Sequence, residues 1–100
     1  MSEQAVIVSV HYSGKTLDDL YVLEDKLTRT IDSAGAGEFD GDEIAKDGSH
    51  GTMYMYGSDA DSLFAVVEPI LRASASLVKP VETVRYGPAV HGTRERVVTL

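Results

Sequence analysis

Cysteine is absent from the sequence, which excludes disulfide bonds and thiolate zinc sites and fits a reducing compartment. An apolar run of membrane-spanning length is also missing, and the acidic, polar segment at residues 2–4 is unlike the basic start of a secretory signal. No glycine-rich phosphate loop follows an expected strand, so a nucleotide-binding motif is lacking. We therefore expect one soluble, cytoplasmic domain, since 100 residues suffice for a single hydrophobic core.

Positive charge is scarce in the first half of the chain. Residues 1–50 hold 4 Lys/Arg against 11 Asp/Glu, whereas residues 51–100 hold 5 of each, so the net charge of −7 belongs to the first half. A negative field disfavours approach to nucleic-acid phosphates and favours a basic partner. The alternative is that the acidity only keeps a small protein soluble.

Hydrophobic periods of two and of 3.6 residues alternate along the chain and predict its helices and strands. The predicted elements are a strand at 5–12, a helix at 17–33, strands at 38–44 and 52–56 joined by a turn at 46–51, a helix capped by Ser58 or Asp59, and a strand at 81–86. The second helix contains Pro69, but its apolar period continues through the proline. Residues 1–90 should form the domain, and the tail 91–100 is either disordered or adds a short edge strand.

This order of elements predicts an α+β fold with the ferredoxin-like βαββαβ arrangement, a four-stranded antiparallel sheet with both helices on one face. Right-handed crossovers then place the first and third strands in the centre and the second and fourth at the edges. Strand parity predicts that Met53 and Met55 are buried. The face away from the helices should carry Ile7, Ser9, His11, Tyr54, Tyr56, Thr83 and Arg85.

The strand at 38–44 is unusually acidic. Its carboxylates are Glu38, Asp40, Asp42 and Glu43, and its apolar side chains are those of Phe39 and Ile44. Such a strand belongs at a sheet edge or a binding surface rather than in a core. A calcium or magnesium site is not expected, because neighbouring residues of a strand point to opposite faces and the twelve-residue loop of an EF-hand is missing.

Two patterns on the open face invite a functional interpretation. Tyr54 and Tyr56 on a middle strand are similar in layout to an RNA-recognition motif, but the basic, glycine-rich sequence of that motif is absent. We therefore expect these tyrosines either simply to cover the sheet or to form a protein-binding face. His11, expected beside Tyr54 or Arg85, is the one candidate for acid–base catalysis, but we expect it rather to be an exposed histidine that packs on tyrosine. The Ser49-His50 step lacks a third group to orient the histidine, so it predicts no nucleophile.

The segment from Glu38 to Pro88 resembles a class of small uncharacterised bacterial proteins with the same order of strands and helices. The resemblance covers about half the chain and rests on GEFDGDE, YMYG, SDADSLFAVVEPILRA and VRYGP. Small acidic bacterial domains of this kind resemble immunity proteins, the cytoplasmic antidotes encoded beside interbacterial toxins. The resemblance implies an inhibitor and assigns no catalytic residues, and the tail after Val90 has no counterpart in it.

These observations favour a non-enzymatic immunity protein that occludes the basic active site of a bacterial toxin. The residues expected to contact the partner are His11, Glu38, Asp40, Asp42, Glu43, Tyr54, Tyr56 and Arg85. We expect no cofactor, metal, nucleic acid or membrane to be bound. The alternatives are a small-molecule or metal-binding domain of the same fold, a small enzyme that uses His11, and a homo-oligomeric structural protein, for instance a homodimer, whose sheets pair through their open faces.

Overall fold

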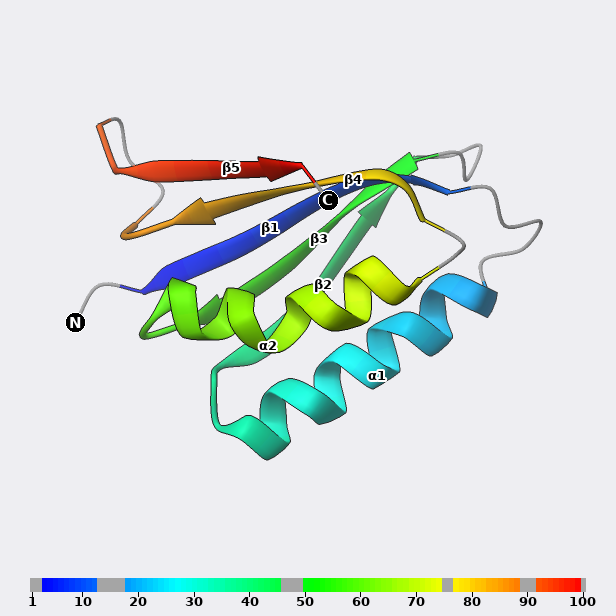
Figure 1. Cartoon of the computed structure of the whole chain (residues 1–100), viewed down its shortest axis with the longest axis horizontal. Helices are drawn as coiled ribbons and strands as arrows, with labels where there is room; N and C mark the ends of the chain where they lie inside the picture. The colour runs from blue at the N-terminus through cyan, green and yellow to red at the C-terminus, as the bar shows by residue number, and fades with distance from the viewer. Residues whose placement is uncertain (1–2, 13–17, 46–49, 75–76, 89–91, 100) are drawn as a thin grey trace.

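The computed structural model describes residues 3–12, 18–45, 50–74, 77–88 and 92–99. These residues form two helices and five strands (Figure 1). In chain order the elements are β1 (Gln4–Tyr12), α1 (Asp18–Ala34), β2 (Glu38–Ile44), β3 (His50–Gly57), α2 (Ala60–Ala73), β4 (Leu77–Arg85) and β5 (Glu95–Thr99). Neither described helix is long and apolar enough to cross a membrane.

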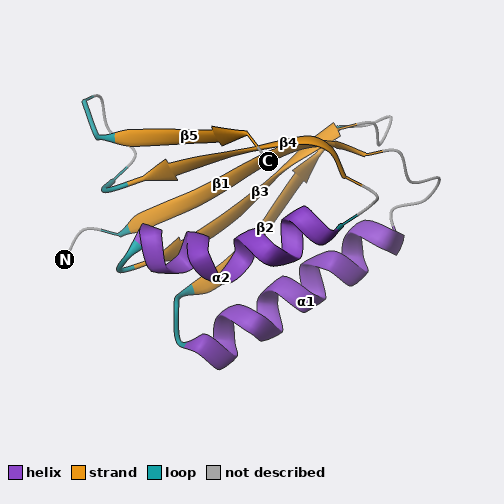
Figure 2. Ribbon diagram, in the orientation of Figure 1, coloured by secondary structure: helices purple, strands orange, loops and turns teal. Residues whose placement is uncertain are grey.

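The five strands form one antiparallel sheet in the order β2-β3-β1-β4-β5, and both helices cover the same face of it (Figure 2). The predicted α+β class and the placement of the helices are confirmed. The predicted number of four strands is wrong, because the C-terminal tail adds β5 as a fifth. As expected, β1 and β3 lie inside the sheet and β2 at an edge, whereas β4 is covered by β5.

The register of the central strand fixes which side chains share a face. β1 pairs with β3 so that Ile7 lies opposite Tyr54, and with β4 so that Ile7 lies opposite Thr83. The predicted pairing of 5–12 with 52–56 is therefore confirmed. The register between β1 and β4 shifts by one residue between Ser9 and His11, and the pairing then continues with His11 opposite Val78.

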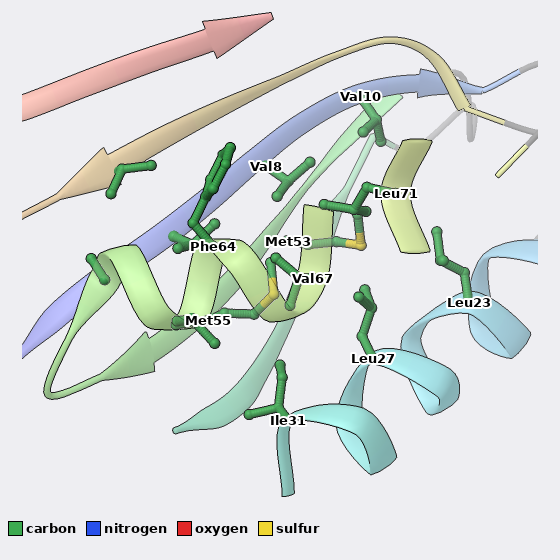
Figure 3. Packing of buried hydrophobic residues seen from close by; sticks show 14 of the residues in the cluster. Val8, Val10, Leu23, Leu27, Ile31, Met53, Met55, Phe64, Val67 and Leu71 are labelled. Atoms are coloured by element: carbon green, nitrogen blue, oxygen red, sulfur yellow. The ribbon is translucent and has the colours of Figure 1, made fainter. Parts of the chain in front are cut away.

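Side chains from both helices and the sheet form the core between them (Figure 3). The buried residues of the helices repeat at spacings of three and four and include Leu20, Leu23, Leu27 and Ile31 of α1 and Leu63, Val67 and Leu71 of α2. The sheet contributes Val6, Val8, Val10, Met53, Met55 and Val84. Tyr54 and Tyr56, on the other face of β3, are only half-buried, so the predicted division of this strand is confirmed.

The ends of the elements agree with the sequence prediction at α2 and differ from it at the start of β4. Asp59, rather than Ser58, caps α2, and its side chain accepts hydrogen bonds from two backbone N–H groups of the first turn. The helix continues through Pro69. β4 begins at Leu77, four residues before the predicted start of the last strand. The start of the first predicted helix and most of the predicted turn at 46–51 lie outside the described residues.

Candidate functional site

The acidic strand β2 forms one edge of the sheet and contains a bulge. Glu38 pairs with Tyr56 of β3, but the register then shifts at Asp40, so that Gly41 pairs with Tyr54. Gly41 has a φ of 119°, a conformation that side-chain-bearing residues rarely adopt. The bulge leaves Asp40 exposed and twists the strand locally, which makes this edge a poor template for pairing with another strand.

The bulge also reverses the direction of Asp42. Asp42 pairs with the buried Met53, so its carboxyl group points toward the helices and lies near Glu24 of α1. Burial, and then the neighbouring Asp42 carboxyl, raise the pKa of Glu24 to about 8. One oxygen of Glu24, Oε2, is buried and has no hydrogen-bond partner among the described residues. At neutral pH the Glu24 carboxyl is therefore largely protonated, and the structure separates Asp42 from the other three carboxylates of β2.

Two of the remaining acidic residues of β2, Glu38 and Glu43, lie beside the tyrosines of β3. Glu38 is directly opposite Tyr56, and Glu43 is a diagonal neighbour of Tyr54. Burial, and then the charge of Glu43, raise the pKa of the Tyr54 hydroxyl above its ordinary value. The face that carries these side chains has no helix over it (Figure 2). We call Glu38, Asp40, Glu43, Tyr54 and Tyr56 the acid–tyrosine surface.

Arg85 lies on the same face but on the far side of β1. The row that runs across the sheet at this level is Glu38, Tyr56, Ala5, Arg85 and Glu95. Tyr56 and Arg85 are thus two strands apart, or about 10 Å, with a fully buried Ala5 between them. The guanidinium Nε of Arg85 donates a 2.8 Å hydrogen bond to the carbonyl of Gly87. Arg85 therefore borders the acid–tyrosine surface without contacting its carboxylates.

His11 lies at the other end of β1, away from these residues. It pairs with His50, and the two imidazole rings are 5.7 Å apart and inclined by 50°. Four residues of extended chain, about 13 Å, separate His11 from Ile7, the residue opposite Tyr54. The predicted position of His11 beside Tyr54 or Arg85 is wrong, because that prediction did not include the strand register.

Glu82 of β4 is a buried carboxyl group that sequence reasoning missed. It lies opposite Val8 of β1 and Val98 of β5 on the helix-covered face, and its side chain is 0% exposed. Neither carboxyl oxygen has a hydrogen-bond partner in the described part of the chain. Its parity with Val84 in the sequence, two residues on, was the signal that it faces the core.

The surroundings of Glu82 change its acidity in both directions. Burial, and then the charge of Glu68, raise the pKa of Glu82 to about 7. The guanidinium groups of Arg72 and Arg96 act in the opposite sense and lower it, but less strongly. Glu82 is thus a buried acid that changes charge close to neutral pH.

A group of side chains links β5 to the first turn of α2. The Arg96 guanidinium lies 5.2 Å from the centre of the Phe64 ring and its Nη2 lies 3.4 Å from Oδ1 of Asp61. The Tyr86 hydroxyl donates a 2.7 Å hydrogen bond to the same oxygen, and the Arg94 guanidinium lies 5.2 Å from the centre of the Tyr86 ring. We call these five residues the β5 clasp.

Charge is distributed unevenly across the sheet. The acid–tyrosine surface lies at the β2 edge, and α1, which contacts β2, adds Glu24, Asp25 and Asp32. Arg72, Arg85, Arg94 and Arg96 lie on or beside α2, β4 and β5 toward the opposite edge. A basic partner would therefore be attracted to the β2 edge.

No group of three or more His, Asp or Glu side chains that could hold a metal ion occurs within the described ranges. The sequence matches no model of a known protein family and no curated protein.

Proposed function

We propose that the protein is a non-enzymatic binding domain that holds a basic protein partner against the acid–tyrosine surface. The observation that carries this proposal is the position of Glu38 and Glu43, which flank Tyr54 and Tyr56 on a sheet face with no helix over it. Asp40 is exposed at the bulge between them. The three carboxylates are exposed and form no ion pair with a described residue. A cationic partner would compensate them.

The two residue types at this surface have complementary effects on binding. Tyrosine contributes a large apolar area and a hydroxyl group at a low cost in side-chain entropy, which suits the centre of an interface. Exposed carboxylates at the rim contribute mainly to the association rate, because they attract a basic partner over a distance. The β2 bulge opposes simple strand addition, so side chains rather than the backbone edge would make the contact.

Within this class, we propose an immunity protein that acts in the cytoplasm and covers the active site of a cognate bacterial toxin. A catalytic cleft that binds an anionic substrate is itself cationic, so an acidic surface with projecting tyrosines suits its entrance. The resemblance of residues 38–88 to small bacterial proteins of this type supports the same proposal. We also propose that β1 to β4 with the two helices represent the ferredoxin-like arrangement, to which β5 has been added.

Coexpression with the protein encoded next to this one tests the proposal. If that protein is a toxin, cells that carry the wild-type domain should grow, and cells that carry Glu38→Lys with Asp40→Lys should stop growing although the variant still accumulates. Glu95→Lys provides the control, because Glu95 is exposed on the same face but at the opposite edge of the sheet. Equal protection by the edge variant would remove the acid–tyrosine surface from the interface, and a harmless neighbour that does not bind would remove the immunity proposal.

A second candidate function is self-association through the open face. Val97 of β5 is 65% exposed there and lies in one row with Tyr54, Ile7 and Thr83. A two-fold pairing of open faces would cover this apolar row. Analytical sedimentation of the wild type and of Val97→Glu tests this candidate. The wild type must be a dimer, and the substitution must dissociate it.

A further inference from the structure

We propose that Glu82 and β5 form a pH-sensitive latch, in which β5 stays on β4 while the Glu82 carboxyl is protonated and separates from it when that carboxyl ionises. The latch lies at the β5 edge of the sheet, opposite the acid–tyrosine surface, so it does not depend on the proposed function.

The position of Glu82 makes its ionised form costly. α2 covers this part of the sheet, and the directly opposite residues on the two neighbouring strands are both valines, Val8 and Val98. The charged groups that face Glu82 are Glu68 and Arg72 from α2 and Arg96 from β5, and β1 contributes only the apolar Val8. A buried carboxylate without hydrogen bonds is strongly unfavourable, so ionisation requires water or a rearranged arginine.

Both nearby arginines already have other partners. Nη2 of Arg72 lies 3.2 Å from Oε2 of Glu68, one turn earlier on α2. Nη2 of Arg96 lies 3.4 Å from Oδ1 of Asp61 in the β5 clasp. Glu82 itself lacks a hydrogen bond to any described residue. The closed structure therefore suits the neutral carboxyl and leaves the carboxylate uncompensated.

β5 is the neighbouring element that can move most easily. It has five residues, of which Val98 is partly buried and the other four are exposed. α2, in contrast, buries Leu63, Val67 and Leu71 in the core. The Arg96–Asp61 ion pair of the β5 clasp is exposed to solvent, and ion pairs of that kind stabilise a structure only weakly. Separation of β5 would admit water to Glu82 and uncover the edge of β4.

The direction of the pH dependence follows from the acidity of Glu82. Burial and then Glu68 raise its pKa to about 7, so the carboxyl is neutral at pH 5.5 and ionised at pH 8.5. We therefore expect a closed β5 at the lower pH and an increasingly open β5 at the higher pH.

Amide hydrogen exchange of the full-length chain, followed by NMR between pH 5.5 and 8.5, tests the latch. After correction for the intrinsic exchange rate, the protection of the β5 amides paired with β4 should fall at least tenfold across this range. These amides should also be less protected than those of the β1–β3 pair at each pH, which identifies the opening as local. Glu82→Gln, a neutral mimic of the protonated carboxyl, should remove the pH dependence at β5. Glu95→Gln, on the opposite face of β5, should retain it.

Three results would overturn the latch. The first is equal protection of β5 and the β1–β3 pair at every pH, because opening would then be global. The second is protection of the wild-type β5 amides that does not change with pH, a result that can be obtained without any variant. The third is a pH dependence of β5 that persists in Glu82→Gln.

Discussion

Asp42 of β2 lies beside Glu24 of α1, and this contact divides the acidic strand into an inward and an outward part. The division arises at Gly41, where the bulge shifts the register so that Asp42 faces the same way as Phe39. The outward part is left with Glu38, Asp40 and Glu43 for contact with a partner.

The raised pKa of Glu24, about 8 instead of 4.5, predicts how stability depends on pH. The folded state holds this proton more tightly than the unfolded state, so its contribution is complete below pH 4.5 and is lost as the pH rises to about 8. Glu24→Gln should therefore match the wild type at pH 4 and exceed its free energy of unfolding at pH 9. We expect a gain of about 1 kcal/mol, because the partial exposure of Glu24 reduces the effect.

Urea denaturation at pH 4, 7 and 9 measures this gain. Asp25→Asn is the matched control, because Asp25 is the next residue of α1 and its carboxylate is exposed in an ion pair with Arg29. The control should not become more stable than the wild type as the pH rises. A Glu24→Gln protein with an unchanged pH profile would show that the folded state does not hold the Glu24 proton more tightly than the unfolded state.

The bulge in β2 depends on the conformation of Gly41. An added Cβ would meet no atom within 4 Å, so the cost of Gly41→Ala is that of the backbone conformation alone. We expect the free energy of unfolding to fall by about 1–3 kcal/mol. Gly37→Ala should cost more, because Gly37 also has a positive φ and its Cβ would overlap the carbonyl oxygen of Tyr56. Chemical denaturation of both variants measures which substitution lowers the free energy of unfolding more. A Gly41→Ala protein as stable as the wild type would contradict the bulge.

The division of β3 into a buried and an open face predicts the cost of truncating a methionine. Met55 is 0% exposed and lies among the buried side chains between the sheet and the helices (Figure 3). Met55→Ala should lower the free energy of unfolding by about 2–5 kcal/mol. Val22→Ala on the outer side of α1, where Val22 is 70% exposed, should change it by less than about 0.5 kcal/mol. A similarly small effect of Met55→Ala would mean that the faces of β3 are reversed.

The hydrophobic period of the sequence predicted most of the fold, because this period arises where one face of a helix or strand is buried. The spacing of Leu20, Leu23, Leu27 and Ile31 identified the buried face of α1, and the alternation in residues 52–56 assigned both faces of β3. The tail could not be assigned in the same way. Four of the five residues of β5 are exposed, so the strand has almost no apolar alternation and depends on pairing with β4.

The arrangement of the candidate site was harder to predict than the fold. The bulge at Gly41 is a property of the backbone, and no side-chain pattern indicates that Asp42 turns inward. The position of His11 depends on register, which places it opposite His50 rather than near Tyr54. Glu82 has the parity of a core residue, but a charged side chain at such a position is uncommon.

The dissociation constant of the purified partner tests the acid–tyrosine surface most directly. The variant is Glu38→Lys with Asp40→Lys, since both side chains are exposed at an edge where lysine is well tolerated. Asp42 is left unchanged because it lies beside Glu24 and its replacement would disturb the α1–β2 contact. The circular dichroism and thermal unfolding of this variant should match those of the wild type. Glu95→Lys at the opposite edge is the control, because it replaces one carboxylate with an ammonium group, as each substitution in the edge variant does.

The edge variant should bind at least tenfold more weakly than the wild type, a loss of about 1.4 kcal/mol, and its association rate should become less sensitive to salt. The control should bind within about twofold of the wild type, because it lies on the same sheet face but away from the acid–tyrosine surface. An edge variant that binds as tightly as the wild type, or a control that is weakened equally, would contradict the proposed interface.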